Sequence, residues 1–188
     1  MNLLNPNMIM KKTLYSILMM AGLLVAFTSC EKEEIGDTAG VKTAGDWYVT
    51  VDAVDANGGL VYSDDELFGI GQFHVLTYNT AANIPTEMIV SDLGNFWDFA
   101  VKVSCDPNTM TFSTTTTDEN NLVEGYEDIN VTITDGKILP GAARLASGVA
   151  TDAIEFFVTF SDDGYPDAYG YAKYRVHGYR YSGFVADE

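Results

Sequence analysis

The sequence predicts an all-β domain, a single antiparallel β-barrel of about eight or nine strands. Apolar and polar residues alternate with a period of two in most segments after residue 45, which is the pattern of half-buried strands. Short runs of glycine, asparagine and aspartate separate these segments, and such residues favour tight turns. The chain has 188 residues, too few for two ordinary domains. Short strands joined by turns predict a sandwich or an up-and-down barrel.

The alternating segments follow one another from the first strand to the end of the chain. In each of them, the apolar set is expected to point inward and the polar set outward. The cleanest alternation runs from Trp97 to Ser104. The expected inward positions are, in order, Val49, Val51 and Ala53; Phe73, Val75 and Thr77; Trp97, Phe99, Val101 and Val103; Met110 and Phe112; Ile129, Val131 and Ile133; Ile154, Phe156, Val158 and Phe160; Tyr174, Val176 and Gly178.

Turn sequences separate these strands. They are Asn57-Gly58-Gly59, Asp106-Pro107-Asn108, Asp135-Gly136 and Asp162-Asp163-Gly164. Asp135-Gly136 is typical of a two-residue turn, so it predicts a hairpin that joins Ile129–Thr134 to Lys137–Leu139. The segment Ala142–Ala146 is the one patch compatible with a helix, and its flanking glycines limit that helix to one or two turns.

Residues 1–29 have the pattern of a lipoprotein signal peptide. Two lysines precede an apolar run from Leu14 to Phe27, which is shorter than the about 20 residues of a transmembrane helix. Small residues then lead to Cys30, and this arrangement resembles the lipobox of bacterial lipoproteins in the relaxed form found in Bacteroidetes. The resemblance implies acylation of Cys30 and a membrane anchor. The alternative is an ordinary signal peptide followed by a chance cysteine.

Residues 30–44 are expected to form an acylated, acidic and flexible tether ahead of a barrel domain at residues 45–188. Glu31-Lys32-Glu33-Glu34 resembles the surface-export signal of Bacteroidetes lipoproteins, which implies a lipid-anchored location at the outer membrane, on the cell surface. The alternative is a solvated spacer. The Gly/Thr/Ala-rich residues that follow are typical of a flexible linker. The true start is Met1 or Met10.

The charge balance excludes some classes of partner. The chain has 27 acidic and 10 basic residues, a net charge of −17. Nucleic-acid binding depends on neutralisation of phosphates by lysine and arginine, so we expect no nucleic-acid partner. Adsorption to anionic lipid through basic patches is disfavoured for the same reason.

One pair of residues indicates how the barrel closes. Gly45-Asp46-Trp47 opens the first strand and Arg180 lies in the last. This pair resembles the lipocalin (calycin) arrangement, in which a Gly-x-Trp packs beneath an arginine or lysine from the end of the barrel. The resemblance implies that Trp47 plugs one end of the barrel and that Arg180 stacks on its indole.

Four stretches, one of which contains this Gly-x-Trp, resemble the Bacteroidetes family of lipid-binding putative hydrolases, which has a calycin-like barrel. They are Gly45–Val49, Leu76–Ala81, Phe96–Phe99 and Gly178–Phe184. The resemblance implies a calycin/lipocalin-like barrel that binds a small hydrophobic or lipid ligand. A barrel of about eight strands can hold one such ligand. The candidate pocket residues, chosen from the apolar faces, are Phe73, Trp97, Phe99, Phe156 and Val158.

A second hypothesis is a surface accessory protein that binds a glycan or a partner protein. Tyrosines are dense near the carboxyl end, and a tyrosine ring has an apolar body with a polar tip, which suits a wet binding face. Tyr169, Tyr171 and Tyr179 would share one polar face with Lys173, Arg175 and His177. Loss of glycan binding on substitution of Tyr171 and Tyr179 would identify this function.

A third hypothesis is an esterase-like hydrolase, which the name of the resembling family suggests. No serine lies in a Gly-x-Ser-x-Gly sequence, so no catalytic residue is assigned. His74 and His177 are the histidines that a hydrolase would use. No cysteine or histidine cluster has the spacing of a metal site, so no metal or cofactor is expected. Cys105 is interpreted as a small strand residue.

Overall fold

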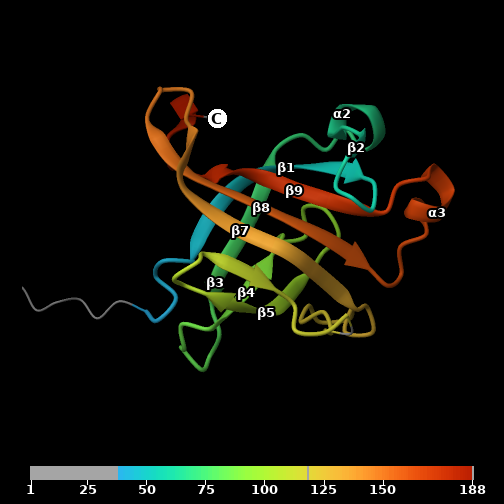
Figure 1. Cartoon of the computed structure of the whole chain (residues 1–188), viewed down its shortest axis with the longest axis horizontal. Helices are drawn as coiled ribbons and strands as arrows, with labels where there is room; N and C mark the ends of the chain where they lie inside the picture. The colour runs from blue at the N-terminus through green and yellow to red at the C-terminus, as the bar shows by residue number, and fades with distance from the viewer. Residues whose placement is uncertain (1–37, 118, 188) are drawn as a thin grey trace, which may run out of the picture. The chain divides into compact units, whose positions relative to one another are not determined.

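The computed structural model describes residues 38–117 and 119–187. These residues form an antiparallel sheet with two short helices and one 3-10 turn (Figure 1). The strands are β1 (Gly45–Val54), β2 (Leu60–Tyr62), β3 (Phe73–Asn79), β4 (Glu87–Ser91), β5 (Ala100–Asp106), β6 (Thr111–Ser113), β7 (Val131–Arg144), β8 (Ala150–Phe160) and β9 (Lys173–Arg180); the helices are α2 (Asp64–Leu67) and α3 (Tyr165–Tyr169), and the 3-10 turn is η1 (Val185–Asp187).

The sheet closes on itself. From β3 to β9 each strand pairs with the next along the chain, β1 pairs with β3 on one side, and β1 also pairs with β9 on the other. Eight strands therefore form a closed barrel, and β2 pairs only with the end of β1. Closure leaves no edge between β1 and β9, which removes a site for unwanted strand pairing. The prediction of an all-β antiparallel barrel with eight or nine strands is confirmed.

The two ends of the barrel, the helix end and the Trp47 end, differ. At the helix end, β1 finishes and β9 begins, and this end carries α2, α3 and the loop of residues 92–99. At the Trp47 end, β1 begins, β9 finishes, and the β7–β8 hairpin projects beside η1 (Figure 1). The chain also enters the barrel at the Trp47 end, through turns in residues 38–44 that bury Thr43.

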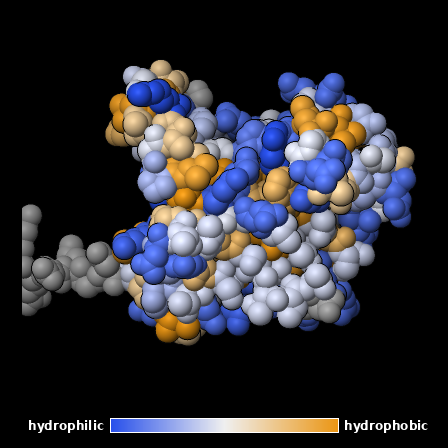
Figure 2. All heavy atoms as spheres, viewed as in Figure 1, coloured by the Kyte–Doolittle hydropathy of each residue, from blue (hydrophilic) through white to orange (hydrophobic). Residues whose placement is uncertain are grey.

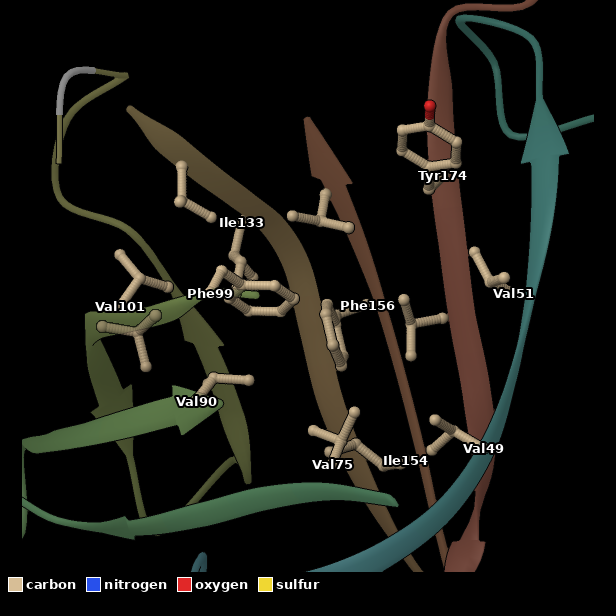
Figure 3. Close-up of a cluster of buried hydrophobic side chains, with 14 of the residues drawn as sticks. Val49, Val51, Val75, Val90, Phe99, Val101, Ile133, Ile154, Phe156 and Tyr174 are labelled. Atoms are coloured by element: carbon tan, nitrogen blue, oxygen red, sulfur yellow. The ribbon is translucent and has the colours of Figure 1, made fainter. Parts of the chain in front are cut away.

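Inward-facing side chains from all parts of the barrel form one apolar core. Figure 3 shows valines of β1, β3, β4 and β5 meeting Phe99, Ile133 and Phe156 in the interior. These side chains are almost fully shielded from solvent, so their burial is the main favourable term in folding. Tyr174 lies at one end of the cluster, with its hydroxyl directed away from the other labelled side chains. The alternating residues of the sequence thus supply the core.

Trp47 and Arg180 meet at the other end of the barrel. The indole is fully buried, and its Nε1–H donates to Thr77 Oγ1 at 2.9 Å. The guanidinium carbon of Arg180 lies 4.3 Å from the centre of the indole ring. The same guanidinium donates to the carbonyl oxygen of Ala44 at 2.8 Å and to Asp152 at 3.2 Å. Arg180 therefore ties the last strand to the start of the first.

The predicted hairpin at Asp135-Gly136 is wrong. β7 continues through both residues, and its register with β8 shifts between Thr134 and Lys137. Asp135 has a φ of 52°, and a Cβ on Gly136 would come within 2.6 Å of the carbonyl oxygen of Phe112. Aspartate and glycine tolerate the backbone of a β-bulge as well as that of a tight turn, which is why this sequence suggested a hairpin.

Two other local predictions are also corrected. The segment Ala142–Ala146 forms no helix: it contains the end of β7, where Ala143 and Arg144 pair with β8, because sheet pairing overrides the helix propensity of alanine. The predicted strand from Trp97 begins only at Ala100, since residues 97–99 belong to a loop.

Residues 37–188 form one compact unit. This unit contains a closed barrel with its own apolar core, which is the condition for independent folding. The predicted signal peptide, Cys30 and most of the tether lie outside the described residues. Within the described residues, no helix has the length and apolar character needed to cross a membrane.

Candidate ligand pocket at the helix end

A buried aspartate organises the loop between β4 and β5. The Asp92 side chain is fully buried, and its carboxylate accepts hydrogen bonds from five backbone N–H groups of residues 94–99, at 2.7–3.0 Å. Two of these donors belong to Phe96 and Trp97. Buried N–H groups without an acceptor are costly, so Asp92 fixes the backbone that presents these two rings. Asp92 was not among the residues predicted from the sequence.

Phe96 lies at the centre of an aromatic cluster across the helix end of the barrel. Its ring centre is 5.0 Å from that of Tyr174, 5.6 Å from that of Trp97 and 6.0 Å from that of Phe68. Most of these pairs are edge-to-face, which is a favourable arrangement of aromatic quadrupoles. Trp97 also stacks on Phe160 at 4.8 Å with nearly parallel planes. The cluster therefore joins the core to the surface at this end.

The segment around α2 forms one wall. Glu66 accepts a hydrogen bond from the backbone N–H of Ser63 at 2.9 Å, which caps the start of the helix. This bond holds the pKa of Glu66 below its usual value. Asp64 is buried and accepts from the N–H groups of Ile70 and Gly71 at 3.1 and 2.7 Å. The two acids thereby shape the segment that presents Leu67, Phe68 and Ile70.

The α3 segment forms the facing wall. Asp163 accepts a hydrogen bond from the backbone N–H of Tyr165 at 2.8 Å, just before the helix. The helix ends at Gly170, whose φ of 77° is readily adopted only by glycine. Tyr165 and Tyr169 lie one turn apart, with ring centres 5.9 Å apart, and about half of each residue is exposed. The short helix therefore presents two phenol rings to solvent and to the opposite wall.

A pocket of about 290 Å³ lies between these walls. Its volume is at the lower limit of the about 300–1,000 Å³ typical of small-molecule sites, and such sites are mostly apolar. The pocket is lined by Leu67, Phe68, Ile70, Phe96, Trp97, Tyr165 and Tyr169. The lining is apolar and aromatic, with polar atoms at the edges of the rings. This chemistry suits an alkyl chain or a flat apolar group.

Two tyrosine hydroxyls and a carboxylate form a chain of hydrogen bonds beside the α3 segment. The hydroxyls of Tyr171 and Tyr174 are 2.7 Å apart, and Tyr174 donates to Asp163 Oδ2 at 2.6 Å. Burial raises the pKa of Tyr171 to about 12 and raises that of Tyr174 further, where the neighbouring Asp163 carboxylate adds to the effect. Both phenols stay protonated at physiological pH, so they serve as fixed hydrogen-bonding groups that anchor the α3 segment.

The candidate pocket residues from the sequence fall into two groups. Trp97 lines the pocket, while Phe73, Phe99, Phe156 and Val158 are buried within the barrel core. Whether the buried four contact a ligand stays a prediction. The other pocket residues were missed because they lie in α2, α3 and a loop, where no strand periodicity marks them. The local density of tyrosine was the only signal that included Tyr165 and Tyr169.

The predicted polar face of tyrosines is only partly correct. Tyr179 lies on the outside of β9, where its ring centre is 6.0 Å from that of Tyr48. Tyr169 belongs to α3 instead of the strand, and Tyr171 is buried against Tyr174. The helix between β8 and β9 interrupts the alternation, so residues on its two sides do not share a face.

Both histidines lie on the outside of the barrel and pair with aspartates. Nδ1 of His74 is 2.7 Å from Asp46, and Nε2 of His177 is 3.0 Å from Asp52. Burial alone raises the pKa of Asp52, but hydrogen bonds from Arg175 and His177 outweigh it and hold the pKa below its usual value. Among the described residues, the hydrogen-bonding partner that each imidazole has is a carboxylate and not a serine or threonine hydroxyl. The geometry therefore supplies carboxylate–histidine pairs without an aligned nucleophile.

The remaining candidate groups are a thiol and a wide depression. Cys105 is buried, its thiol donates to the carbonyl oxygen of Pro85, and burial raises its pKa, so it is unsuited to nucleophilic attack. The depression has a volume of about 640 Å³ over β5, β6 and β7, and its lining includes Asp106, Asp135 and Lys137. Its open, mixed-polarity surface suits an apolar ligand less well. Among the described residues, no three side chains of the metal-binding types converge.

A closed eight-stranded barrel with an aromatic pocket at one end defines a class of protein, the small-ligand-binding β-barrels. Comparison with known families is more specific, because the family model of the lipid-binding putative hydrolases matches residues 32–185. The chain belongs to this family. A search of curated proteins found no significant match.

Proposed function

We propose that the protein binds a small hydrophobic or lipid ligand in the pocket at the helix end of the barrel. The observation that carries this proposal is the apolar and aromatic lining of that pocket in a barrel of a lipid-binding family. Asp92, Asp64 and Asp163 fix the backbone of all the walls, so the site is largely formed before binding. A preformed site avoids the entropic cost of ordering loops around the ligand.

The size of the pocket limits what it holds. A volume of about 290 Å³ accommodates part of an alkyl chain or one ring system, and not a whole phospholipid. The favourable term is transfer of apolar surface from water, about 25 cal/mol per Å² before association costs. We therefore expect a ligand whose apolar portion enters between Phe96 and the α3 tyrosines while its polar head stays at the rim.

Native mass spectrometry of residues 37–188, with a solvent extract analysed in parallel, tests this proposal. We expect an adduct of a few hundred daltons that is recovered in the extract as an alkyl-chain compound. A bare polypeptide mass, both as purified and after incubation with mixed fatty acids and phospholipids, would overturn the proposal.

Two variants locate the site. Tyr165→Ala combined with Tyr169→Ala removes two half-exposed rings from one wall, and we expect at least a tenfold loss of affinity with little effect on folding. Tyr78→Ala removes a similarly exposed ring from β3, outside the pocket lining, and is the matched control. Equal binding by both variants would exclude this pocket as the site.

A second candidate function, glycan or protein binding, is favoured by the exposure of Tyr165 and Tyr169. About half of each residue is accessible to solvent, so the rings are also available to stack on a sugar or a partner surface. A glycan array with the wild-type protein and the double tyrosine variant tests this function. Retention of a glycan by wild type alone, without any lipid adduct, would favour it over lipid binding.

We also propose that the protein is a lipoprotein of the outer membrane, anchored through Cys30 and exposed on the cell surface. The support is the basic, apolar and small-residue sequence that precedes this cysteine. Metabolic labelling with a fatty acid, followed by cell fractionation, is the test. We expect label in the outer-membrane fraction and its loss in Cys30→Ser; labelling of the variant or a wholly soluble wild type would contradict the proposal.

A further inference from the structure

Charge is unevenly distributed between the two ends of the barrel. The connections at the helix end are residues 55–59, 63–72, 92–99, 114–130 and 161–172. In sequence, every one of these segments contains acidic residues, and none contains a lysine, arginine or histidine. In Figure 2, an apolar patch lies among hydrophilic residues at the upper right, where Figure 1 places α2 and β2. The pocket therefore opens among connections whose charged residues are all acidic, although Lys173 begins β9 directly after the last of them, with its ammonium over the ring of Phe157.

Several of these acids are close to the pocket lining. Asp162 accepts a hydrogen bond from Nε1 of Trp97 at 3.1 Å, so one carboxylate touches a lining ring directly. Asp167 lies within α3, between the two lining tyrosines. Asp65 lies in α2, two residues before Leu67. These carboxylates belong to the same short elements as the lining residues, so we expect them to act on a headgroup at the rim, where charges interact over a Debye length of about 8–10 Å.

The lining itself favours the same sign of ligand charge. The faces of aromatic rings carry negative potential, and they attract ammonium groups placed over them. Five of the seven lining residues are aromatic. An alkyl carboxylate would find no cationic partner in the helix-end connections and would meet both the carboxylates and the ring faces. An ammonium headgroup would be attracted by both.

We propose that the pocket selects amphiphiles with a positively charged amine or quaternary ammonium headgroup and discriminates against fatty acid anions. This inference rests on the proposed ligand-binding function and adds the charge of the headgroup to it. Several carboxylates within a Debye length at the protein surface, together with the ring faces, correspond to about a tenfold higher affinity for a cationic headgroup than for a neutral one. We therefore expect the affinity for a cationic headgroup to exceed that for an anionic headgroup by about a hundredfold.

A series of ligands with one alkyl chain tests the headgroup. Decyltrimethylammonium, decanol and decanoate are titrated below their micellar concentrations into residues 37–188 at low ionic strength. The chain has two tryptophans, and Trp47 is fully buried at the opposite end, so a fluorescence change reports mainly Trp97. We expect affinities in the order cation, alcohol, anion, and a reduced spread in 0.5 M salt because the charges are screened.

A matched pair of double variants locates the effect. Asp162→Asn with Asp167→Asn neutralises two acids at the rim and keeps an oxygen acceptor for Trp97. Asp106→Asn with Asp135→Asn makes the same change in net charge at the wide depression, away from the pocket. We expect the rim variant to lose most of the preference for the cation, with decanol binding unchanged. The control variant should keep the wild-type preference.

The outcomes separate the two proposals. Equal affinity for all three ligands, or tighter binding of decanoate, would overturn the charge selection while leaving ligand binding intact. If the control variant loses the cation preference to the same extent as the rim variant, the preference is due to net charge, and the proposed charge selection by the pocket would also be overturned. Failure of all three ligands, decanol included, would overturn the proposed function itself.

Discussion

Arg180→Met is expected to destabilise the barrel by about 2–3 kcal/mol. Methionine keeps an unbranched apolar side chain over the Trp47 indole but removes the guanidinium. The lost contacts are a cation–π contact at 4.3 Å, worth about 1 kcal/mol in a half-buried position, and a charged hydrogen bond of 2.8 Å to Ala44, worth about 1.5 kcal/mol. The ion pair with Asp152 adds little, because both side chains are about one-third exposed.

Urea unfolding of residues 37–188, followed by circular dichroism, measures this change. A loss of 2–3 kcal/mol corresponds to a fall in Tm of about 4–12 °C for a domain of this size. Arg144→Met is the matched control, because this arginine in β7 is exposed and donates a hydrogen bond of 3.2 Å to the carbonyl oxygen of Gly148. We expect the control to change stability by less than about 0.5 kcal/mol.

Equal stability of the two arginine variants would refute the reasoning that Arg180 closes the barrel. Arg180→Lys then separates charge from geometry. Lysine keeps the positive charge but lacks the planar group that stacks and donates in two directions, so it should recover less than half of the loss. Full recovery with lysine would show that charge alone matters at this position.

Three further perturbations have definite expected outcomes. Asp92→Ala leaves five backbone N–H groups without their acceptor. We therefore expect the free energy of unfolding in urea to fall by at least about 3 kcal/mol and the ligand-induced fluorescence change to disappear. The control Asp98→Asn, at a φ of 53° that asparagine tolerates, should keep both the stability and the fluorescence change. Gly178→Ala places a Cβ 2.6 Å from Val49 Cα and still closer to the Tyr48 carbonyl oxygen, so its Tm should fall by more than 5 °C, and a wild-type Tm would contradict the close packing of β1 on β9. The folded-state pKa of Asp52 is lowered, so its ionised carboxylate adds stability above about pH 4, near the pKa of aspartate in the unfolded chain, and this stability is lost as the pH falls through the folded-state pKa. Asp52→Asn should therefore flatten the acid side of the profile of stability against pH. An unchanged profile would show that the ion pair contributes nothing to stability.

Much of the barrel could be predicted from local pattern alone. Val49, Val51, Phe156 and Val158 alternate with polar residues, and a strand with one face in a core produces that period wherever it occurs. The same reasoning failed at Asp135-Gly136, because aspartate and glycine are suited to a β-bulge as well as to a hairpin turn. Only the pairing of β7 with β8 distinguishes them.

The pocket was harder to predict than the barrel for a physical reason. Its walls are a loop and two helices of four and five residues, which are too short to show a period of 3.6. Their shape depends on hydrogen bonds that single buried carboxylates accept, such as those that the N–H groups of Phe96 and Trp97 donate to Asp92. Such bonds produce no regular sequence pattern, because an aspartate that organises a loop cannot be distinguished by sequence from any other aspartate in a loop.

The sequence by itself therefore determined the all-β class, the approximate number of strands and most of the inward-facing residues, because alternation is a local property of each strand. Tertiary structure decided how the barrel closes, with β9 returning to β1, and which rings meet. Trp97, Tyr165 and Tyr169 are brought to one pocket although β5 to β8 separate the first from the other two. Contacts of that kind depend on the register of the intervening strands, which no single segment specifies.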